Sequence, residues 1–182
     1  MTYKFLLFDL DHTLLDFDAA EDVALTQLLK EEGVEDIQAY KSYYVPMNKT
    51  LWKDLEQKKI TKADLVNTRF SNLFAHFGTE KDGVYLAERY QFFLSKQGQI
   101  FPGVENLLKT LIHYGYELYA ATNGITFIQT GRIEHSGIAT FFKEIFISEQ
   151  LHTQKPDPEF YEKIGARIPN FDKNQTLMIG DS

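Results

Sequence analysis

The stretch KFLLFDLDHTL, residues 4–14, places two aspartates directly after a strongly apolar run. The segment from Lys4 to Leu10 is mostly apolar, with phenylalanines among the aliphatic side chains. Continuous apolar runs of this length are typical of strands that are buried on both faces, as in a parallel sheet. The stretch therefore predicts a buried first strand whose carboxyl end carries Asp9 and Asp11.

Strand and helix patterns alternate from Pro102 onward. Helical patterns run from Pro102 to Gly115, then up to Gly137, and again over Pro158–Ala166. Between them, short apolar strands fit three ranges: Glu117–Thr122, Glu144–Ser148 and Thr176–Ile179. This alternation predicts an α/β fold, a doubly wound parallel sheet with a Rossmann-like core and helices on both faces.

The segment between the first strand and residue 98 has a different hydrophobic pattern, since its apolar residues recur at helical spacing. Its clearest helix begins at Thr61, an N-cap candidate with Asp64 three residues later. Pro46 should kink or break the preceding helix. We therefore expect an all-helical domain at residues 16–98, inserted into an α/β core formed by residues 1–15 and 99–182.

Composition excludes several classes of function. The formal net charge of -7 argues against a nucleic-acid-binding protein, which needs a positive field. The absence of cysteine excludes disulfides, thiolate catalysis and cysteine-ligated zinc. The apolar run before Asp9 is too short for a signal peptide or a membrane span, so we expect a cytoplasmic protein without a membrane partner.

Polar side chains follow the predicted strands at the points where the strands end. Asp9 and Asp11 follow the first strand, Thr122-Asn123 the second and Asp181 the last, while Lys155 lies in a loop after the third. Ligands of open α/β sheets bind at this edge. Carboxylate oxygens suit Mg²⁺, and a hydroxyl and an ammonium suit a phosphoryl group, so the sequence predicts a site for both.

Four segments resemble, in order and spacing, the four motifs of the haloacid dehalogenase-like phosphohydrolases. They are Phe8-Asp9-Leu10-Asp11-His12-Thr13-Leu14, Ala121-Thr122-Asn123-Gly124, Gln154-Lys155-Pro156-Asp157 and Ile179-Gly180-Asp181-Ser182. The resemblance implies that Asp9 is the nucleophile that attacks phosphorus. It implies that Asp11 is the general acid/base, and that Lys155 stabilises charge on Asp9 and on the transferring group.

The same resemblance implies the remaining ligands of the site. Thr122 and Asn123, with neighbouring amides, would bind the phosphoryl oxygens. Mg²⁺ would be the cofactor, held by Asp9, Asp181 and the backbone carbonyl of Asp11. Because a phosphoryl transition state is loose, positioning and charge neutralisation can supply most of the catalysis, which this set of groups offers.

The inserted segment resembles the cap of the pyrimidine 5′-nucleotidase branch of the family. The resemblance is carried by Tyr43-Tyr44, Asn48, Leu51-Trp52, Glu56, Ile60-Thr61 and Asn67-Thr68-Arg69-Phe70. It implies that residues 16–98 select the leaving group and that the substrate is a pyrimidine nucleoside monophosphate. Asn48, Trp52 and Arg69 are the candidate substrate contacts, although Trp52 and Phe70 fit the hydrophobic core of a cap at least as well.

Other functions stay open from the sequence. A sugar-phosphate phosphatase or a phosphomutase would share every core residue, and a chain that binds without turnover is the non-enzymatic alternative. A haloacid dehalogenase needs neither a metal nor an acid at the position of Asp11, so the presence of Asp11 and Asp181 counts against that activity. The chain is compatible with a monomer or a homodimer.

The chain ends directly after Asp181, whereas the family continues with a further acidic residue and more strand and helix. We therefore expect these 182 residues to be a shortened piece of a longer phosphatase. A weakened Mg²⁺ site, weak or absent activity and an exposed sheet edge prone to association would follow from that.

Overall fold

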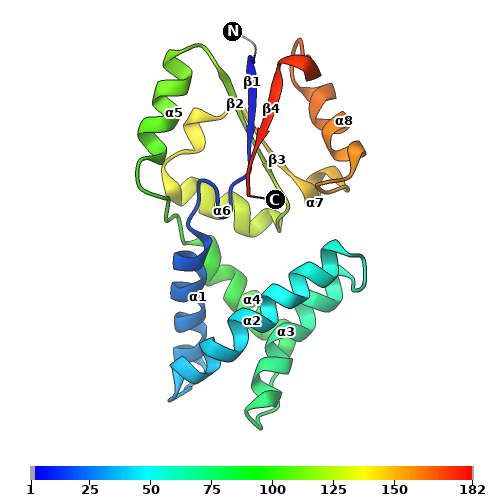
Figure 1. Cartoon of the computed structure of the whole chain (residues 1–182). Coiled ribbons are helices and arrows are strands. Elements are labelled where there is room, and N and C mark those ends of the chain that lie inside the picture. The colour runs from blue at the N-terminus through cyan, green and yellow to red at the C-terminus, as the bar shows by residue number, and fades with distance from the viewer. Residues whose placement is uncertain (1–2, 182) are drawn as a thin grey trace. The chain divides into compact units, whose positions relative to one another are not determined.

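Within residues 3–181, which the computed structural model describes, the strands form one parallel sheet in the order β3-β2-β1-β4. β1 (Phe5–Phe8) lies between β2 (Glu117–Thr122) and β4 (Thr176–Ile179), and β3 (Glu144–Ile147) pairs with β2 (Figure 1). All residues of β1 are buried, as the apolar run predicts. Because the strands are parallel, their carboxyl ends meet at one edge of the sheet.

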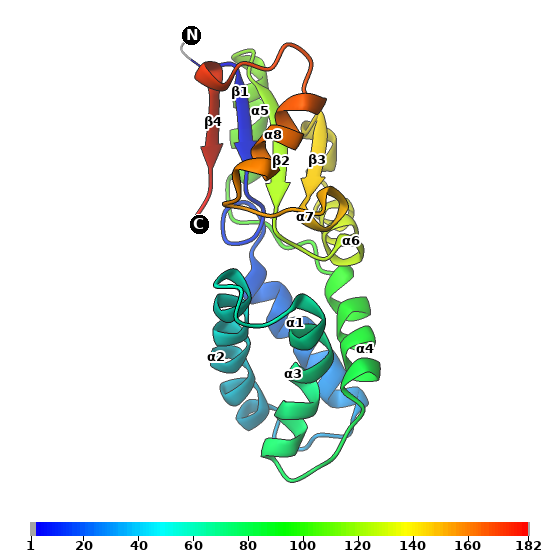
Figure 2. The same ribbon diagram turned by 90° about the vertical axis from the view of Figure 1, so that its right-hand side faces the viewer.

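Helices cover both faces of the sheet. Side chains alternate along β1, so Leu6 and Phe8 pack with α5 (Val104–His113), whereas Phe5 and Leu7 pack with α8 (Pro158–Arg167). In Figure 2, α8 lies in front of the strands and α5 behind them. The remaining elements of this unit are α6 (Thr126–Ser136), a 3-10 turn (Ala139–Phe141), α7 (Ser148–Leu151) and a second 3-10 turn (Lys173–Gln175). The predicted doubly wound α/β fold is confirmed.

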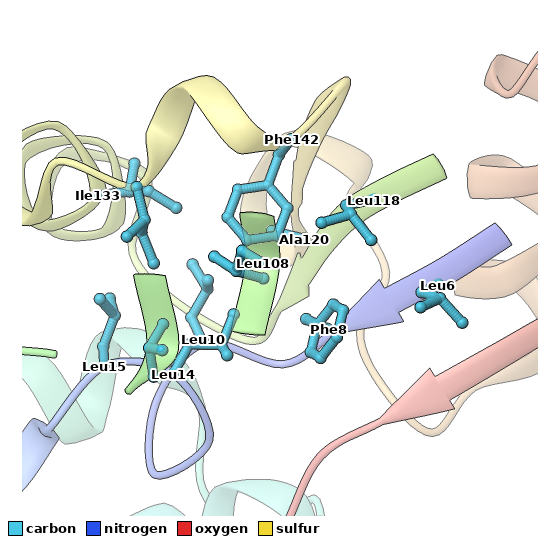
Figure 3. Close-up of a cluster of buried hydrophobic side chains, with 12 residues drawn as sticks. Leu6, Phe8, Leu10, Leu14, Leu15, Leu108, Leu118, Ala120, Ile133 and Phe142 are labelled. Carbon is cyan, nitrogen blue, oxygen red and sulfur yellow. The ribbon is translucent and has the colours of Figure 1, made fainter. Parts of the chain in front are cut away.

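The loop after β1 is held in place by apolar packing. Leu10, Leu14 and Leu15 are buried in the same cluster as Leu108 of α5 and Ile133 of α6 (Figure 3). The backbone amides of Leu14 and Leu15 both donate to the carbonyl of Leu10, at 2.9 and 2.8 Å. The loop that carries the two predicted catalytic aspartates is therefore fixed from within the core.

The chain divides into two compact units, Met1–Ala20 with Ser95–Ser182, and Glu21–Leu94. The second unit is helical and consists of most of α1 (Phe17–Glu31), α2 (Ile37–Glu56), α3 (Lys62–His76) and most of α4 (Gly83–Ser95). Thr61 caps α3 and forms a capping box with Asp64, as predicted. Among the described residues, no helix is long and apolar enough to cross a membrane.

Of the kink or break predicted at Pro46, the break is wrong, because α2 continues through this residue. Tyr44 and Asn48, on either side of the proline, are buried. The ring of Tyr44 stacks on Phe70 of α3, with 5.2 Å between ring centroids. Tertiary packing therefore maintains the helix despite the missing backbone N–H.

Candidate active site

Asp9 and Lys155 form a buried ion pair at the carboxyl end of β1. Lys155 Nζ lies 2.7 Å from Asp9 Oδ2, and the two side chains are only 6% and 8% exposed. Asp9 Oδ1 accepts a hydrogen bond of 2.7 Å from the amide of Leu10. Burial raises the pKa of Asp9 above its ordinary value, and the charge of Lys155 opposes that rise by stabilising the carboxylate.

Asn123 fixes the loop that carries Lys155. Its side-chain amide donates to the carbonyl of Lys155 at 2.9 Å, and its side-chain oxygen accepts from the backbone amide of Lys155 at 2.8 Å. Both polar atoms of this side chain therefore bind the backbone of the loop. The predicted phosphate contact of Asn123 stays a prediction, and it would fall to the backbone amide.

Thr122 and Asp11 are joined by a side chain that the sequence did not identify. The amide nitrogen of Gln129 donates to Thr122 Oγ1 at 2.7 Å and to Asp11 Oδ2 at 2.9 Å. Arg132, from the same helix α6, forms an ion pair with Asp11 Oδ1. Their spacing places both on one face of the helix that directly follows the Thr122 motif, but the spacing does not indicate that this face is buried.

The end of β4 lies directly against Asp9. β4 pairs with β1 so that Ile179 is opposite Phe8. A Cβ on Gly180 would lie 2.8 Å from Asp9 Cβ, a distance that real side chains essentially never show. The glycine therefore permits this close approach, and it brings Asp181, the next residue, to the same edge of the sheet as Asp9.

The oxygen donors at this edge fit Mg²⁺. The carboxylates of Asp9 and Asp181 and the backbone carbonyl of Asp11 are hard ligands of the kind this ion prefers. The carboxylate of Asp11 faces Arg132 and Gln129, which leaves its carbonyl as the predicted ligand. Within residues 3–181 no three His, Cys, Asp or Glu side chains are grouped to hold a metal.

The predicted substrate contacts of the helical unit are found in different environments. Asn48 donates to Glu21 Oε2 at 3.0 Å and accepts from Arg69 Nη1 at 3.4 Å, and both Asn48 and Arg69 are buried. Trp52 is partly buried. The contacts of Asn48 link α1, α2 and α3, so Asn48 and Arg69 help to hold these helices together. Their contact with substrate stays a prediction.

The chain is similar to known hydrolases over its whole length. The family model for haloacid dehalogenase-like hydrolases matches residues 6–182. Pyrimidine 5′-nucleotidase PynA of Streptococcus pneumoniae is 72% identical over 182 residues, which are 100% of this chain and 77% of PynA. Pyrimidine 5′-nucleotidase YjjG of Escherichia coli is 28% identical over 189 residues, covering 100% of this chain and 79% of YjjG.

A solved structure is similar as well. The crystal structure of YfnB from Bacillus subtilis, described as bound to magnesium and as revealing interdomain movement, matches with a TM-score of 0.94. The two proteins are 40% identical, and the match covers 100% of this chain and 79% of that chain.

Proposed function

This chain belongs to the haloacid dehalogenase-like hydrolases, and from that premise we propose that it is a magnesium-dependent 5′-nucleotidase acting on pyrimidine nucleoside monophosphates. The buried pair of Asp9 and Lys155 carries the proposal, because it places a carboxylate that can attack phosphorus 2.7 Å from the side-chain nitrogen of a lysine. The high identity to PynA supports the choice of substrate class.

The proposed reaction has two halves. In the first, a carboxylate oxygen of Asp9 forms a bond to phosphorus while the bond from phosphorus to the nucleoside oxygen breaks, and Asp11 gives its proton to that oxygen. In the second, Asp11 takes a proton from water, whose oxygen attacks the phosphorus of the aspartyl phosphate and releases inorganic phosphate. Asp9 is regenerated as a carboxylate.

The other residues bind and neutralise charge. Thr122 and nearby backbone amides would donate hydrogen bonds to the phosphoryl oxygens, and Lys155 would offset their negative charge. When bound by Asp9, Asp181 and the carbonyl of Asp11, Mg²⁺ would supply further positive charge at the phosphoryl group.

Release of inorganic phosphate from a panel of substrates tests the proposal. We expect the highest kcat/KM for pyrimidine monophosphates such as UMP and dTMP, and lower values for purine monophosphates and sugar phosphates. A preference for sugar phosphates would favour the alternative of a sugar-phosphate phosphatase. Conversion of a sugar phosphate to its isomer without release of phosphate would identify a phosphomutase. Either result would contradict the proposed substrate class.

Removal of Mg²⁺ should lower the rate by about 100-fold or more, because the charge of the phosphoryl group would then be only partly neutralised. Addition of Mg²⁺ to the chelated protein should restore activity, whereas Ca²⁺ should not, since it prefers longer bonds and higher coordination numbers. Titration calorimetry with Mg²⁺ gives a readout that is independent of turnover. Full activity in the presence of excess chelator would contradict the role of the metal.

Asp11→Asn should slow turnover of nucleotides by about 10²-fold to 10⁴-fold, because the amide can neither protonate the leaving oxygen nor accept a proton from water. With p-nitrophenyl phosphate, whose leaving group needs no proton, the aspartyl phosphate should still form and then accumulate. Stopped-flow absorbance should therefore show a burst of p-nitrophenolate followed by a slow phase. Steady-state and burst kinetics equal to those of the unmodified protein would remove the acid/base role of Asp11.

A further inference from the structure

Gln129 and Arg132 are buried polar side chains that the proposed reaction does not yet use. They lie three residues apart on one face of α6 and are 2% and 0% exposed. Burying an amide and a guanidinium is costly unless their hydrogen-bonding groups are satisfied. Their partners include a predicted catalytic group, since both side chains contact the carboxylate of Asp11.

The amide of Gln129 joins Asp11 to Thr122. The side-chain nitrogen of Gln129 is the atom that faces both groups, and a primary amide nitrogen carries two donor hydrogens. This nitrogen lies 2.9 Å from Asp11 Oδ2 and 2.7 Å from Thr122 Oγ1, and it donates one hydrogen to each oxygen. Because Thr122 Oγ1 accepts this bond, its own hydroxyl hydrogen is directed elsewhere and can donate to a phosphoryl oxygen.

Arg132 holds the other oxygen of the same carboxylate. Its guanidinium pairs with Asp11 Oδ1, and its Nε donates to the backbone carbonyl of Gln97 at 3.3 Å. The guanidinium carbon also lies 5.4 Å from the centroid of the Phe17 ring. The two oxygens of Asp11 thus have separate donors, and besides Asp11 the guanidinium contacts the carbonyl of Gln97 and the ring of Phe17, which limits the orientations open to the carboxylate.

Gly124 leaves the space that Gln129 occupies. A Cβ at residue 124 would lie 2.4 Å from Gln129 Cγ, so any larger residue would displace the side chain. This requirement gives the glycine of the Thr122-Asn123-Gly124 segment a physical role. The segment therefore both contacts the Gln129 side chain, through Thr122, and leaves room for it, at Gly124.

We propose that Gln129 and Arg132 are positioning residues that orient the carboxylate of Asp11, and that Gln129 couples this group to the phosphate-binding hydroxyl of Thr122. The inference rests on the proposed phosphatase function. Its consequence is specific, since loss of the Gln129 amide should impair the proton transfers made by Asp11.

Gln129→Met provides the cleanest test, because methionine keeps the length of the side chain in an uncharged form and removes both donors. Arg132 is fully buried, and its removal would leave an unpaired carboxylate and a cavity, so the test does not depend on folding of an Arg132 variant. Thr130→Ala is the matched control, since Thr130 is the next residue of α6 and is exposed.

We expect Gln129→Met to lower kcat for a pyrimidine monophosphate by about 10-fold to 100-fold, the range typical of residues that orient a catalytic group. With p-nitrophenyl phosphate it should produce a burst followed by a slow phase, as expected for Asp11→Asn. In the Asp11→Asn background, Gln129→Met should have little further effect, because residues that act as a unit are not additive. Thr130→Ala should match the unmodified protein throughout.

The outcomes separate the positioning role from the proposed function. If Asp11→Asn is slow but Gln129→Met behaves like Thr130→Ala, the positioning role is wrong and the proposed function stands. If Gln129→Met lowers kcat of the unmodified protein and of the Asp11→Asn variant by the same factor and gives no burst, its effect does not pass through Asp11, which also overturns the inference. If the unmodified protein releases no phosphate, or Asp11→Asn turns over normally, the proposed function fails and this inference fails with it.

Discussion

Asp9→Asn is expected to abolish phosphate release, with a loss of about 10⁴-fold or more. The amide has no anionic oxygen to attack phosphorus, and Asp9 is the carboxylate that forms the buried ion pair with Lys155 at the end of β1. Gly180 packs against Asp9 Cβ and so leaves little room for a neighbouring group to move in. Inorganic phosphate release from a pyrimidine monophosphate, measured with and without Mg²⁺, checks the result.

The Asp9→Asn variant should remain folded. It keeps the shape of the side chain but leaves Lys155 buried without its ionic partner, which would cost about 3 kcal/mol in free energy of unfolding. Typical domains have stabilities of about 5–15 kcal/mol, so this cost should be tolerated. Urea unfolding followed by circular dichroism measures it. Asp18→Asn is the matched control, because its carboxylate is 85% exposed. Measurable turnover by the verified Asp9→Asn protein would contradict the nucleophile assignment.

Lys155→Met is expected to lower kcat/KM by about 10²-fold to 10³-fold, because it removes a preorganised positive charge from the site of phosphoryl transfer. Methionine fills much of the volume of the lysine stem and so limits the cavity that the change would create. Lys109→Met is the control, since the side chain of Lys109 is 56% exposed and pairs with Glu105, four residues earlier in the same helix. Equal activity of the two variants would contradict the role of Lys155.

The same variant has a predicted pH dependence. Burial raises the pKa of Asp9, and Lys155 is the largest influence that lowers it. Without Lys155 the pKa should rise further, so a smaller fraction of Asp9 is ionised at any pH on the acidic side. The acidic limb of the kcat/KM profile should therefore move to higher pH in Lys155→Met. A limb that stays in place, or that moves to lower pH, would show that Asp9 does not set it.

The sheet could be predicted because its signals are local. The apolar run before Asp9 and the short strands at Glu117–Thr122 and Thr176–Ile179 match the observed β1, β2 and β4. Parallel strands place their carboxyl ends together, which is why Asp9 and Lys155 could be assigned to one site before any geometry was known. The observed ion pair of 2.7 Å agrees with that assignment.

The environment of Asp11 could not be predicted in the same way. Gln129 and Arg132 have polar side chains on a helix, and such residues usually face solvent. Only the packing of α6 against the end of β2 and the loop after β1 turns them inward. Similarly, burial of Arg69 and continuation of α2 through Pro46 depend on contacts between helices, which a single sequence does not encode locally.

Acid quenching during turnover, followed by mass spectrometry of the digested protein, tests the role of Asp9 most directly. The Asp11→Asn variant with p-nitrophenyl phosphate is the most favourable sample, because formation of the aspartyl phosphate should outpace its breakdown. We predict one added phosphoryl group on the peptide that contains Asp9, and none after further substitution by Asp9→Asn. A phosphoryl group on another residue, or release of p-nitrophenolate without any phosphorylated protein, would contradict nucleophilic catalysis by Asp9.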